Sequence, residues 1–526
     1  MNGPGEILPR SAALFPHKSA LVTAARELTY AELDQASASV AAALAERGIR
    51  PGERVSLYAQ NRWEWVVAYH AVLRAGAVVN PINVMLTPDE VRHVLRDCQA
   101  VALFASRDKL AALGEALDEV DTLRTVICFD DPPPGAEAFA ACLATTAPRK
   151  VVRVRREQPS TIGYTSGTTG RPKGAVQSQH AVLMNCELTA RMHRRTAADT
   201  LLTALPAPHV YGNVAINSTF LSGGTVVLLE RFDASTVLEL IAKHRVTMFE
   251  GVPAMYAMLL AHERIGATDL GSLTRCTVGG QTIARATIER WQQVSGAPLI
   301  ELWGMTELSG LGTTHWAGAE PCPGSIGVAL PGVEVRIGDL DDASRTAPAG
   351  TPGELLVRGP LVMLGYFGDD EATAETIDED GWLRTGDIAY EDGTGHLFIV
   401  DRRKDMIITA GYNVYPAEIE RVLAAHPAVA MVAVGPIPDE VRGETARAYV
   451  VPSGGATATP EELIAYCRGR LAAYKLPRSI QFVTALPQTS TGKIMRRKLI
   501  DLAAADPLTT GYQLIPFHQK LSPDNL

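Results

Sequence analysis

Residues 164–174 of this chain read Tyr-Thr-Ser-Gly-Thr-Thr-Gly-Arg-Pro-Lys-Gly, a dense run of hydroxyl side chains and glycines with one lysine near its end. Glycine lets backbone N–H groups turn toward an anion, hydroxyl groups add donors, and Lys173 supplies a positive charge. The run lies between an apolar, strand-like segment and a segment that reads as a helix. An ordinary polar surface loop rarely collects so many donors beside a lysine, so the run predicts a phosphate-binding loop.

Strand-like apolar runs and helix-like segments alternate on both sides of this loop, which predicts parallel strands joined by crossover helices. Thr29 and Glu32 have the spacing of a capping box for a helix that reads to Gly48, and Thr87 followed by Pro88 starts another helix. The expected strands of this part of the chain are 55–58, 100–105, 225–229, 246–250, 274–278 and 298–303.

The pattern changes at Gly324, where short β runs broken by glycine indicate a β-rich subdomain over about 324–403. Beyond Asp405 a compact α+β pattern follows, of a size that suits a separate lid-like domain. Its expected elements are helices at 417–425 and 460–473 and strands at 430–434, 446–451 and 480–483. We therefore expect an α/β fold: a large N-terminal domain, 1–403, with parallel sheets flanked by helices and the β-rich subdomain, then a small mobile C-terminal lid domain, 404–526.

Composition excludes several classes of protein. A length of 526 residues predicts more than one domain, and 46% hydrophobic with 20% charged residues is typical of a globular protein. The net charge of −9 argues against nucleic-acid or membrane-surface binding, because both require a cationic face. Seven cysteines without C-x-x-C spacing fit reduced thiols better than disulfides or a zinc site, and the first ten residues lack the apolar core of a signal peptide. We therefore expect a cytoplasmic protein.

The span 201–229 contains no Asp, Glu, Lys or Arg and so requires a check for a membrane helix. It also contains Pro206, Pro208 and Gly212, which interrupt a spanning helix. A buried strand–loop–helix–strand unit is the better interpretation, so we expect no integral membrane segment.

A P-loop of the form G-x-x-x-x-G-K-[ST] is a first explanation of the phosphate-binding run, and it fails at two of its four defining positions. Counted from Gly167, the second glycine is Pro172 and the residue after the lysine is Gly174. Proline before the lysine also removes an N–H that a phosphate cradle would use. A P-loop nucleotidase is therefore disfavoured.

The same run resembles the phosphate-loop signature of the adenylate-forming superfamily, which includes acyl-CoA synthetases, adenylation domains and beetle luciferases. Further motifs of that superfamily follow in its order over nearly the whole chain, and the closest resemblance is to fatty-acid or aryl-acid CoA ligases. These motifs are Trp-Gly-Met-Thr-Glu at 303–307, Gly-Trp-Leu-Arg-Thr-Gly-Asp at 381–387, Asp-Arg-Arg-Lys-Asp at 401–405, Gly-Tyr-Asn-Val-Tyr-Pro at 411–416 with Glu418, and Ser-Thr-Gly-Lys at 490–493.

The resemblance implies ATP-dependent activation of a carboxylate to an acyl-adenylate with release of pyrophosphate, then attack by the CoA thiol to give a thioester and AMP. Because a carboxylate and a triphosphate repel each other, such a site needs cations and donors fixed in place beforehand. The ATP-binding residues that it implies are Thr165, Ser166, Gly167, Thr168, Thr169, Gly170 and Lys173 around the phosphates, together with Gln281, Trp303, Thr306, Asp387 and Arg402. Trp303 would flank the adenine, Asp387 would bind the ribose, and Arg402 would be a second ribose contact or a phosphate contact.

By the same resemblance, Glu307 would be a Mg²⁺ ligand, although an isolated acid at such a position is more often a solvated helix-start residue. Lys493 would be the catalytic lysine that a mobile loop brings to the developing charge, and Lys404 the hinge of the C-terminal domain. Trp303 replaces the tyrosine usual in the family, which puts the shape of the nearby acyl pocket in doubt. Gln488 stands where the family often has arginine.

The acyl pocket implied by the resemblance consists of His209, Tyr211, Ala215, Gly279, Gly280 and Gly304, and Gly411 with Tyr412 would line the tunnel for CoA. His209 would gate the carboxylate as a catalytic residue, while without the resemblance it is as readily a packed histidine. An amino-acid substrate would require an acid near the pocket, and residues 205–217 contain none. An aryl or medium-to-long fatty acid is therefore favoured.

Three functions stay open at this stage: an acyl-CoA ligase, an adenylating enzyme that passes its acyl group to a nucleophile other than CoA, and a binding protein that keeps the fold without turnover. The last is disfavoured because Lys173, Glu307, Asp387 and Lys493 are all present. The oligomeric state, the pathway and the role of the tail after Asp506 are not indicated.

Replacing Lys493 by alanine is expected to cripple adenylation and to spare thioester formation from a supplied acyl-adenylate, since only the first step develops charge between the carboxylate and the α-phosphate. Separate assays of the two half-reactions check this. An equal loss in both would contradict an alternating C-terminal domain.

Overall fold

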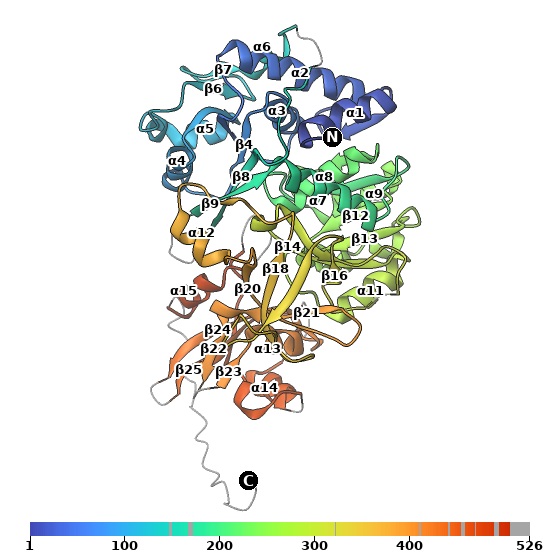
Figure 1. Ribbon diagram of the computed structural model, residues 1–526. Helices are drawn as coiled ribbons and strands as arrows, with labels where there is room; N and C mark the ends of the chain where they lie inside the picture. The colour runs from blue at the N-terminus through green and yellow to red at the C-terminus, as the bar shows by residue number, and fades with distance from the viewer. Residues whose placement is uncertain are drawn as a thin grey trace, which may run out of the picture. The chain divides into compact units, whose positions relative to one another are not determined.

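The computed structural model describes residues 1–146, 150–166, 172–320, 322–409, 412–439, 442–453, 458–468, 470–488 and 494–504. The chain divides into two compact units, of which the first holds Met1–Lys404 and the second begins at Asp405. Figure 1 traces the elements along the chain. The predicted division into functional domains at 403 and 404 remains a prediction.

One sheet of the first unit has the strand order β16-β15-β14-β13-β12-β10-β11-β1-β2. Neighbours from β14 to β1 are parallel, and the pairs at the two edges are antiparallel. These strands are β1 (Ser19–Val22), β2 (Glu27–Thr29), β10 (Thr200–Thr203), β11 (Thr225–Leu228), β12 (Met248–Gly251), β13 (Arg275–Val278), β14 (Leu299–Met305), β15 (Gly310–Thr314) and β16 (Val328–Ala329).

A second sheet has the order β19-β9-β8-β4-β3-β5-β6-β7. It is parallel from β8 to β7, and strands such as Ala100–Ala105 are buried along their whole length, as expected for parallel strands covered on both faces. Its strands are β3 (Arg54–Tyr58), β4 (Val78–Pro81), β5 (Ala100–Ala105), β6 (Thr125–Cys128), β7 (Glu137–Ala138), β8 (Pro159–Ser166), β9 (Pro172–Ser178) and β19 (Gly365–Tyr366).

Helices connect the parallel strands, as the sequence predicts. Capping boxes start two of them, at Thr29 and at Thr87, where each threonine accepts the N3 backbone N–H and the N3 glutamate accepts the threonine N–H. The helices of the first unit are α1 (Ile7–Leu14), α2 (Tyr30–Glu46), α3 (Trp63–Arg74), α4 (Pro88–Asp97), α5 (Arg107–Leu113), α6 (Phe139–Leu143), α7 (Gln179–Met192), α8 (Val210–Leu221), α9 (Ala234–His244), α10 (Pro253–Ala261), α11 (Arg285–Ser295) and α12 (Asp370–Thr376).

The uncharged span 201–229 forms β10, α8 and β11, so the predicted buried strand–loop–helix–strand unit is confirmed. Among the described helices, none combines the length and the apolar character needed to cross a bilayer.

The β-rich subdomain of the first unit is an antiparallel sheet in the order β17-β18-β20-β21. Its strands are β17 (Glu334–Gly338), β18 (Gly353–Arg358), β20 (Leu383–Glu391) and β21 (Leu397–Arg402), and η5 (Arg403–Asp405) follows.

The second unit has its own hydrophobic core around a sheet in the order β23-β22-β25-β24, with β26 paired to β25. Its strands are β22 (Ile407–Thr409), β23 (Tyr412–Val414), β24 (Val429–Asp439), β25 (Gly443–Pro452) and β26 (Ser479–Phe482), and its helices are α13 (Pro416–Ala424), α14 (Pro460–Arg468) and α15 (Leu499–Ala504). The helix predicted over 460–473 therefore ends earlier than expected.

The segment after the phosphate-loop run corrects one expectation, because it is the strand β9 and not the start of a helix. β9 pairs antiparallel with β8, and α7 begins only at Gln179 (Figure 1). Val176 and its neighbours pair on one side with β8 and on the other with β19, a pairing that local sequence does not reveal.

A buried ion pair between Arg195 and Glu250 fixes α8 against the first sheet. Both side chains are about 1% exposed. Arg195 Nη1 also donates to Thr219 Oγ1 at 2.6 Å and to the Ala215 carbonyl at 3.1 Å, both on α8. The pair therefore holds the helix whose first turn follows His209.

Replacing Glu250 by alanine is expected to lower the free energy of unfolding by about 3–5 kcal/mol, because it leaves the Arg195 charge buried without its partner. Urea titration followed by circular dichroism measures this. Glu289→Ala is the matched control: its pair with Arg285 joins exposed side chains one helical turn apart, and its loss should cost only about 0.3–0.5 kcal/mol. Equal losses in the two variants would contradict the expectation.

Candidate active site

The phosphate-loop run forms the end of the β8–β9 hairpin. Thr165 and Lys173 are directly opposite each other in its register, so the strand pairing alone brings a hydroxyl and an ammonium group to the same end. Ser166 ends β8, and its side chain lies outside the described residues, as do the predicted phosphate contacts Gly167, Thr168, Thr169 and Gly170.

Lys173 lies against the end of β19 and the residues that follow it. Its Nζ is 3.6 Å from Asp369 Oδ2 and 5.6 Å from the centre of the Tyr366 ring. Asp369 also caps α12 by accepting the Ala372 N–H, so the partner of the lysine is itself fixed. The side chain of Lys173 remains 24% exposed, which leaves its charge accessible to an anion.

Glu307, in the short helix η4 (Thr306–Leu308) after β14, is buried with 6% exposure. Its Oε1 accepts hydrogen bonds from the hydroxyls of Tyr366 at 3.0 Å and Thr165 at 3.4 Å. Burial raises the pKa of Glu307 above its ordinary value, although these hydrogen bonds and Arg402 oppose the shift. Within the described residues no lysine or arginine lies within ion-pair distance of this carboxylate.

Asp387 on β20 is held from two sides and is also only 6% exposed. The indole Nε1 of Trp303 donates to its Oδ2 at 2.8 Å, and Arg402 Nε lies 3.2 Å from its Oδ1. Arg402 is directly opposite Asp387 in the β20–β21 register. The tryptophan that replaces the family's tyrosine is therefore a donor to the predicted ribose-binding carboxylate.

Gln281 and Thr306 follow the carboxyl ends of adjacent strands of the first sheet, where ligands bind in open α/β sheets. Gln281 is half-buried after β13, and Thr306 begins η4 directly after β14. The Thr306 carbonyl accepts the side-chain amide of Gln177 on β9 at 3.0 Å, so η4 is tied to the β8–β9 hairpin.

A cavity connects the predicted acyl pocket with this region. Its walls include His209 and Asn213 from the start of α8, Pro206 before it, and Thr306 with Tyr164 from the nucleotide side. His209 is also the N-cap of α8, where its Nδ1 accepts the Tyr211 N–H at 3.3 Å. His209 therefore caps α8 and is also exposed at the cavity wall.

The other predicted pocket residues are not part of the described cavity wall. Tyr211 and Ala215 are buried in α8, and the Tyr211 hydroxyl is 2.7 Å from Thr277 Oγ1. A Cβ on Gly279 would lie 2.2 Å from Leu302 Cδ1, and one on Gly304 would lie 2.1 Å from the Gly310 carbonyl oxygen. Close packing thus requires these two glycines, whereas Gly280 has a positive φ and only Val252 at 3.6 Å.

The remaining predicted residues are outside this cluster. Lys404 is exposed in η5 at the end of the first unit. In the second unit, Tyr412 is 58% exposed and stacks on Tyr474 with ring centres 4.9 Å apart. Gly411 and Lys493 lie outside the described residues. The roles predicted for these residues stay predictions.

The sequence reasoning missed Tyr366 and Gln177. Tyr366 bonds to Glu307 and lies beside Lys173, and Gln177 bonds to the carbonyl between β14 and η4. Neither residue belongs to a motif that signals chemistry, and only the pairing of β9 with β8 and β19 brings them to the site.

Comparison with known proteins agrees with this geometry. The sequence profile described as "AMP-binding enzyme" matches residues 8–367, and that of the "AMP-binding enzyme C-terminal domain" matches residues 418–493. This chain belongs to the AMP-binding enzyme family. It is 34% identical to a long-chain-fatty-acid–CoA ligase of Bacillus subtilis over 94% of this chain and 93% of that protein. It is 37% identical to an indoleacetate–CoA ligase of Aromatoleum aromaticum over 95% and 98% of the two chains.

Among solved structures, the AMP-binding enzyme is similar to an anthranilate CoA ligase in complex with anthranoyl-AMP. The TM-score is 0.90 at 29% identity, over 96% of this chain and 98% of that one. The predicted membership of the adenylate-forming superfamily and the predicted α/β fold class are confirmed. The predicted enzyme class, an AMP-forming acid–thiol ligase, is confirmed as well.

Replacing Glu307 by glutamine is expected to raise the thermal stability of the ligand-free protein at neutral pH. The raised pKa means that the folded state holds a proton more tightly than the unfolded state, so ionisation costs stability as the pH rises above the ordinary glutamate value near 4.5. The stability advantage of the variant should therefore shrink as the pH falls through this window. Melting curves from pH 4 to 8, with a chelator and without ATP, measure it.

Glu354→Gln is the control, for which the opposite change in thermal stability is expected. Glu354 is just as buried, but it lies 3.0 Å from Arg403 Nη1, so loss of its charge should lower stability at neutral pH. A Glu307→Gln variant that is as destabilised as Glu354→Gln would contradict the assignment of Glu307 as a buried acid without a paired cation among the described residues.

Proposed function

We propose that this AMP-binding enzyme joins an aromatic or fatty carboxylate to CoA, through an acyl-adenylate made from ATP with Mg²⁺. The acyl group of this substrate carries no charge besides its carboxylate. The observation that carries the proposal is the cavity shared by His209 and Thr306, because its wall combines residues predicted for the acyl group with residues predicted for the nucleotide. An in-line attack of a carboxylate on the α-phosphate requires these two groups in one enclosure.

The nucleotide would be held by two parts of the first unit. Lys173 offers a partly exposed charge to the phosphates at the end of the β8–β9 hairpin. Asp387 would accept hydrogen bonds from the ribose hydroxyls while Trp303 and Arg402 fix its orientation. A carboxylate that two donors already orient loses little freedom when it binds a ligand.

Glu307 would hold Mg²⁺. The residues fit the ion: a buried carboxylate without a paired lysine or arginine among its described neighbours, beside the Thr165 hydroxyl, is an oxygen ligand that a hard cation stabilises. When bound, such an ion neutralises phosphate charge. Tyr366 and Thr165 keep the carboxylate in place for it.

The described cavity wall contains no Asp, Glu, Lys or Arg, which favours an uncharged acyl group over an amino acid or a second carboxylate. Ligases for fatty and for aromatic acids among the relatives support both substrate classes. CoA as the acceptor rests on the same relatives. Location in the cytoplasm rests on the free thiols of the described cysteines.

The test is a panel of aryl, fatty, dicarboxylic and amino acids, scored for pyrophosphate, AMP and thioester with and without CoA. We expect AMP and thioester with aryl or fatty acids, and little turnover of the dicarboxylic and amino acids. If no acid yields AMP, the reaction class is wrong. AMP without any thioester would instead favour a nucleophile other than CoA.

Replacing Trp303 by phenylalanine is expected to weaken ATP binding about tenfold or more, because it removes a hydrogen bond to a buried carboxylate. The KM for the acid should change much less, since Trp303 is not part of the described cavity wall. Calorimetric titration with ATP measures the first effect and steady-state kinetics the second. Trp316→Phe, at an exposed tryptophan, is the control. A larger change in the KM of the acid than in ATP affinity would contradict the role of Trp303.

A further inference from the structure

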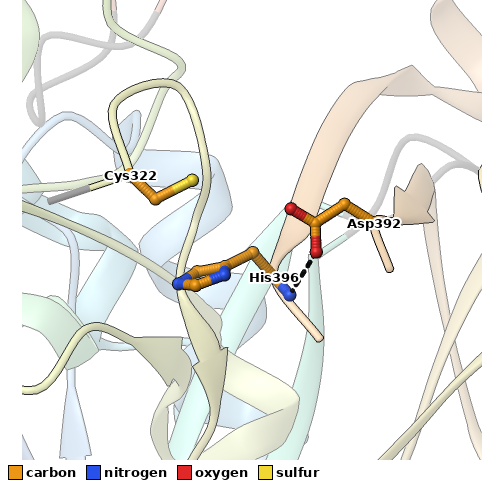
Figure 2. Close-up of side chains that lie close together, drawn as sticks. All are labelled: Cys322, Asp392 and His396. Carbon is orange, nitrogen blue, oxygen red and sulfur yellow. Dashed lines mark hydrogen bonds between the residues drawn. The ribbon is translucent and has the colours of Figure 1, made fainter. Parts of the chain in front are cut away.

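Three side chains outside the active-site residues combine a thiol, a carboxylate and an imidazole at one place. Cys322, Asp392 and His396 each offer one ligand atom, and these atoms all lie within 4.8 Å of one another. Cys322 belongs to the loop between β15 and β16, while Asp392 and His396 flank the turn between β20 and β21. Figure 2 shows the three side chains converging from these two segments.

We propose that this cluster, named here the Cys322 site, binds a divalent transition-metal ion of borderline softness, with Zn²⁺ as the best match. Thiolate and imidazole are ligands that Zn²⁺ prefers and that Mg²⁺ and Ca²⁺ do not use. Three protein ligands with one position left for water are a recurrent arrangement for zinc. The proposal does not depend on the proposed function, because it uses none of the predicted active-site residues.

The geometry is close to what the ion needs. Zinc–ligand distances of about 2.0–2.3 Å place tetrahedral ligands roughly 3.4–3.8 Å apart. The present separations, up to 4.8 Å, therefore close by about an ångström. Cys322 is in a loop, so its position adjusts without breaking strand pairing.

Two of the ligands are already oriented by the turn that carries them. The Thr394 hydroxyl is 2.7 Å from Asp392 Oδ1 and 2.7 Å from His396 Nδ1, so one side chain links both. Asp392 Oδ1 also accepts the backbone N–H groups of Thr394 at 2.8 Å and His396 at 3.0 Å. All of these described bonds use Oδ1, which leaves Oδ2 for an ion. Such outer-shell bonds fix ligand orientation in established metal sites.

The surroundings give the ion access and a suitable charge. Cys322 borders a cavity of about 240 Å³ that His315 and Glu301 also line, which provides an entry path and room for a water ligand. Burial, with the nearby acids Asp392 and Glu301, raises the pKa of the Cys322 thiol and Arg285 opposes the shift, so the thiolate depends on a bound cation to stabilise it. The His315 ring lies 5.6 Å from that of His396, so a second imidazole borders the site.

The consequence of binding would be local. The ion would tie the loop before β16 to the β20–β21 turn, and the two strands joined by that turn carry Asp387 and Arg402. Any ligand that binds only the folded state raises its stability in proportion to occupancy. We therefore expect Zn²⁺ to stabilise the protein without taking part in catalysis.

The experiment is a titration of the reduced, nucleotide-free enzyme with Co²⁺, which serves as a spectroscopic probe, followed by competition with Zn²⁺. The wild type should bind one ion with a thiolate-to-metal charge-transfer absorption. Cys322→Ser should lose that absorption. His396→Gln and Asp392→Asn should lower affinity more than Thr394→Val, which should cost about 10–100-fold as the loss of an outer-shell partner. The Asp392→Asn variant retains a side-chain oxygen that can accept the hydrogen bonds of the turn, so its folding is preserved.

Two variants outside the site are the controls. Cys128→Ser removes another thiol that lies beside acidic residues. His262→Gln removes a half-exposed histidine. Both should bind Co²⁺ as the wild type does. If Cys322→Ser fails to fold, Zn²⁺ protection of Cys322 from iodoacetamide in the wild type, read by mass spectrometry, replaces it. Absence of saturable binding, charge-transfer absorption that persists in Cys322→Ser, or labelling unaffected by Zn²⁺ would each overturn the proposal.

Discussion

Two hydrogen-bonded carboxylates, Asp387 on β20 and Glu307 directly after β14, connect the end of β14 to the other sheets of the first unit. Trp303 donates to Asp387 of the antiparallel β-rich sheet, and Glu307 accepts from Tyr366 and Thr165 of the other parallel sheet. The short stretch of β14 and η4 from Trp303 to Glu307 therefore contacts both of the other sheets. Hydrogen bonds to charged groups are stronger than neutral ones, and burial makes their loss more costly.

The two carboxylates differ in how their buried charges are stabilised. Asp387 lies beside Arg402 and the Trp303 indole, whereas Glu307 has only hydroxyl partners among the described side chains and a raised pKa. A buried acid without a paired cation is unfavourable for folding, and it persists where a ligand supplies the missing charge. By contrast, Glu250 and Arg195 satisfy each other and serve to hold α8.

The sequence predicts local structure well and distant pairing poorly. Capping residues identify the starts of α2 and α4, and alternating strand and helix patterns identify the parallel sheets, because both signals lie within one segment. The helix expected in place of β9 was wrong, and Tyr366 was missed, because both depend on strand pairs that local sequence does not encode. For the same reason the search for C-x-x-C spacing could not consider Cys322 together with His396, because the two residues are far apart in sequence and meet only in the fold.

Trp303 departs from the family's usual tyrosine, and its contacts in the structure show what the replacement changes. From sequence, the larger ring put the shape of the acyl pocket in doubt. In the structure the side chain is 9% exposed, packs against Gly312, donates its N–H to Asp387 and is not part of the described cavity wall. A tyrosine hydroxyl and an indole N–H differ in reach and direction, so the exchange alters how the predicted ribose contact is held. Under the proposed function, selection of the acid would then rest on His209, Asn213 and the start of α8, the helix that the Arg195–Glu250 pair holds.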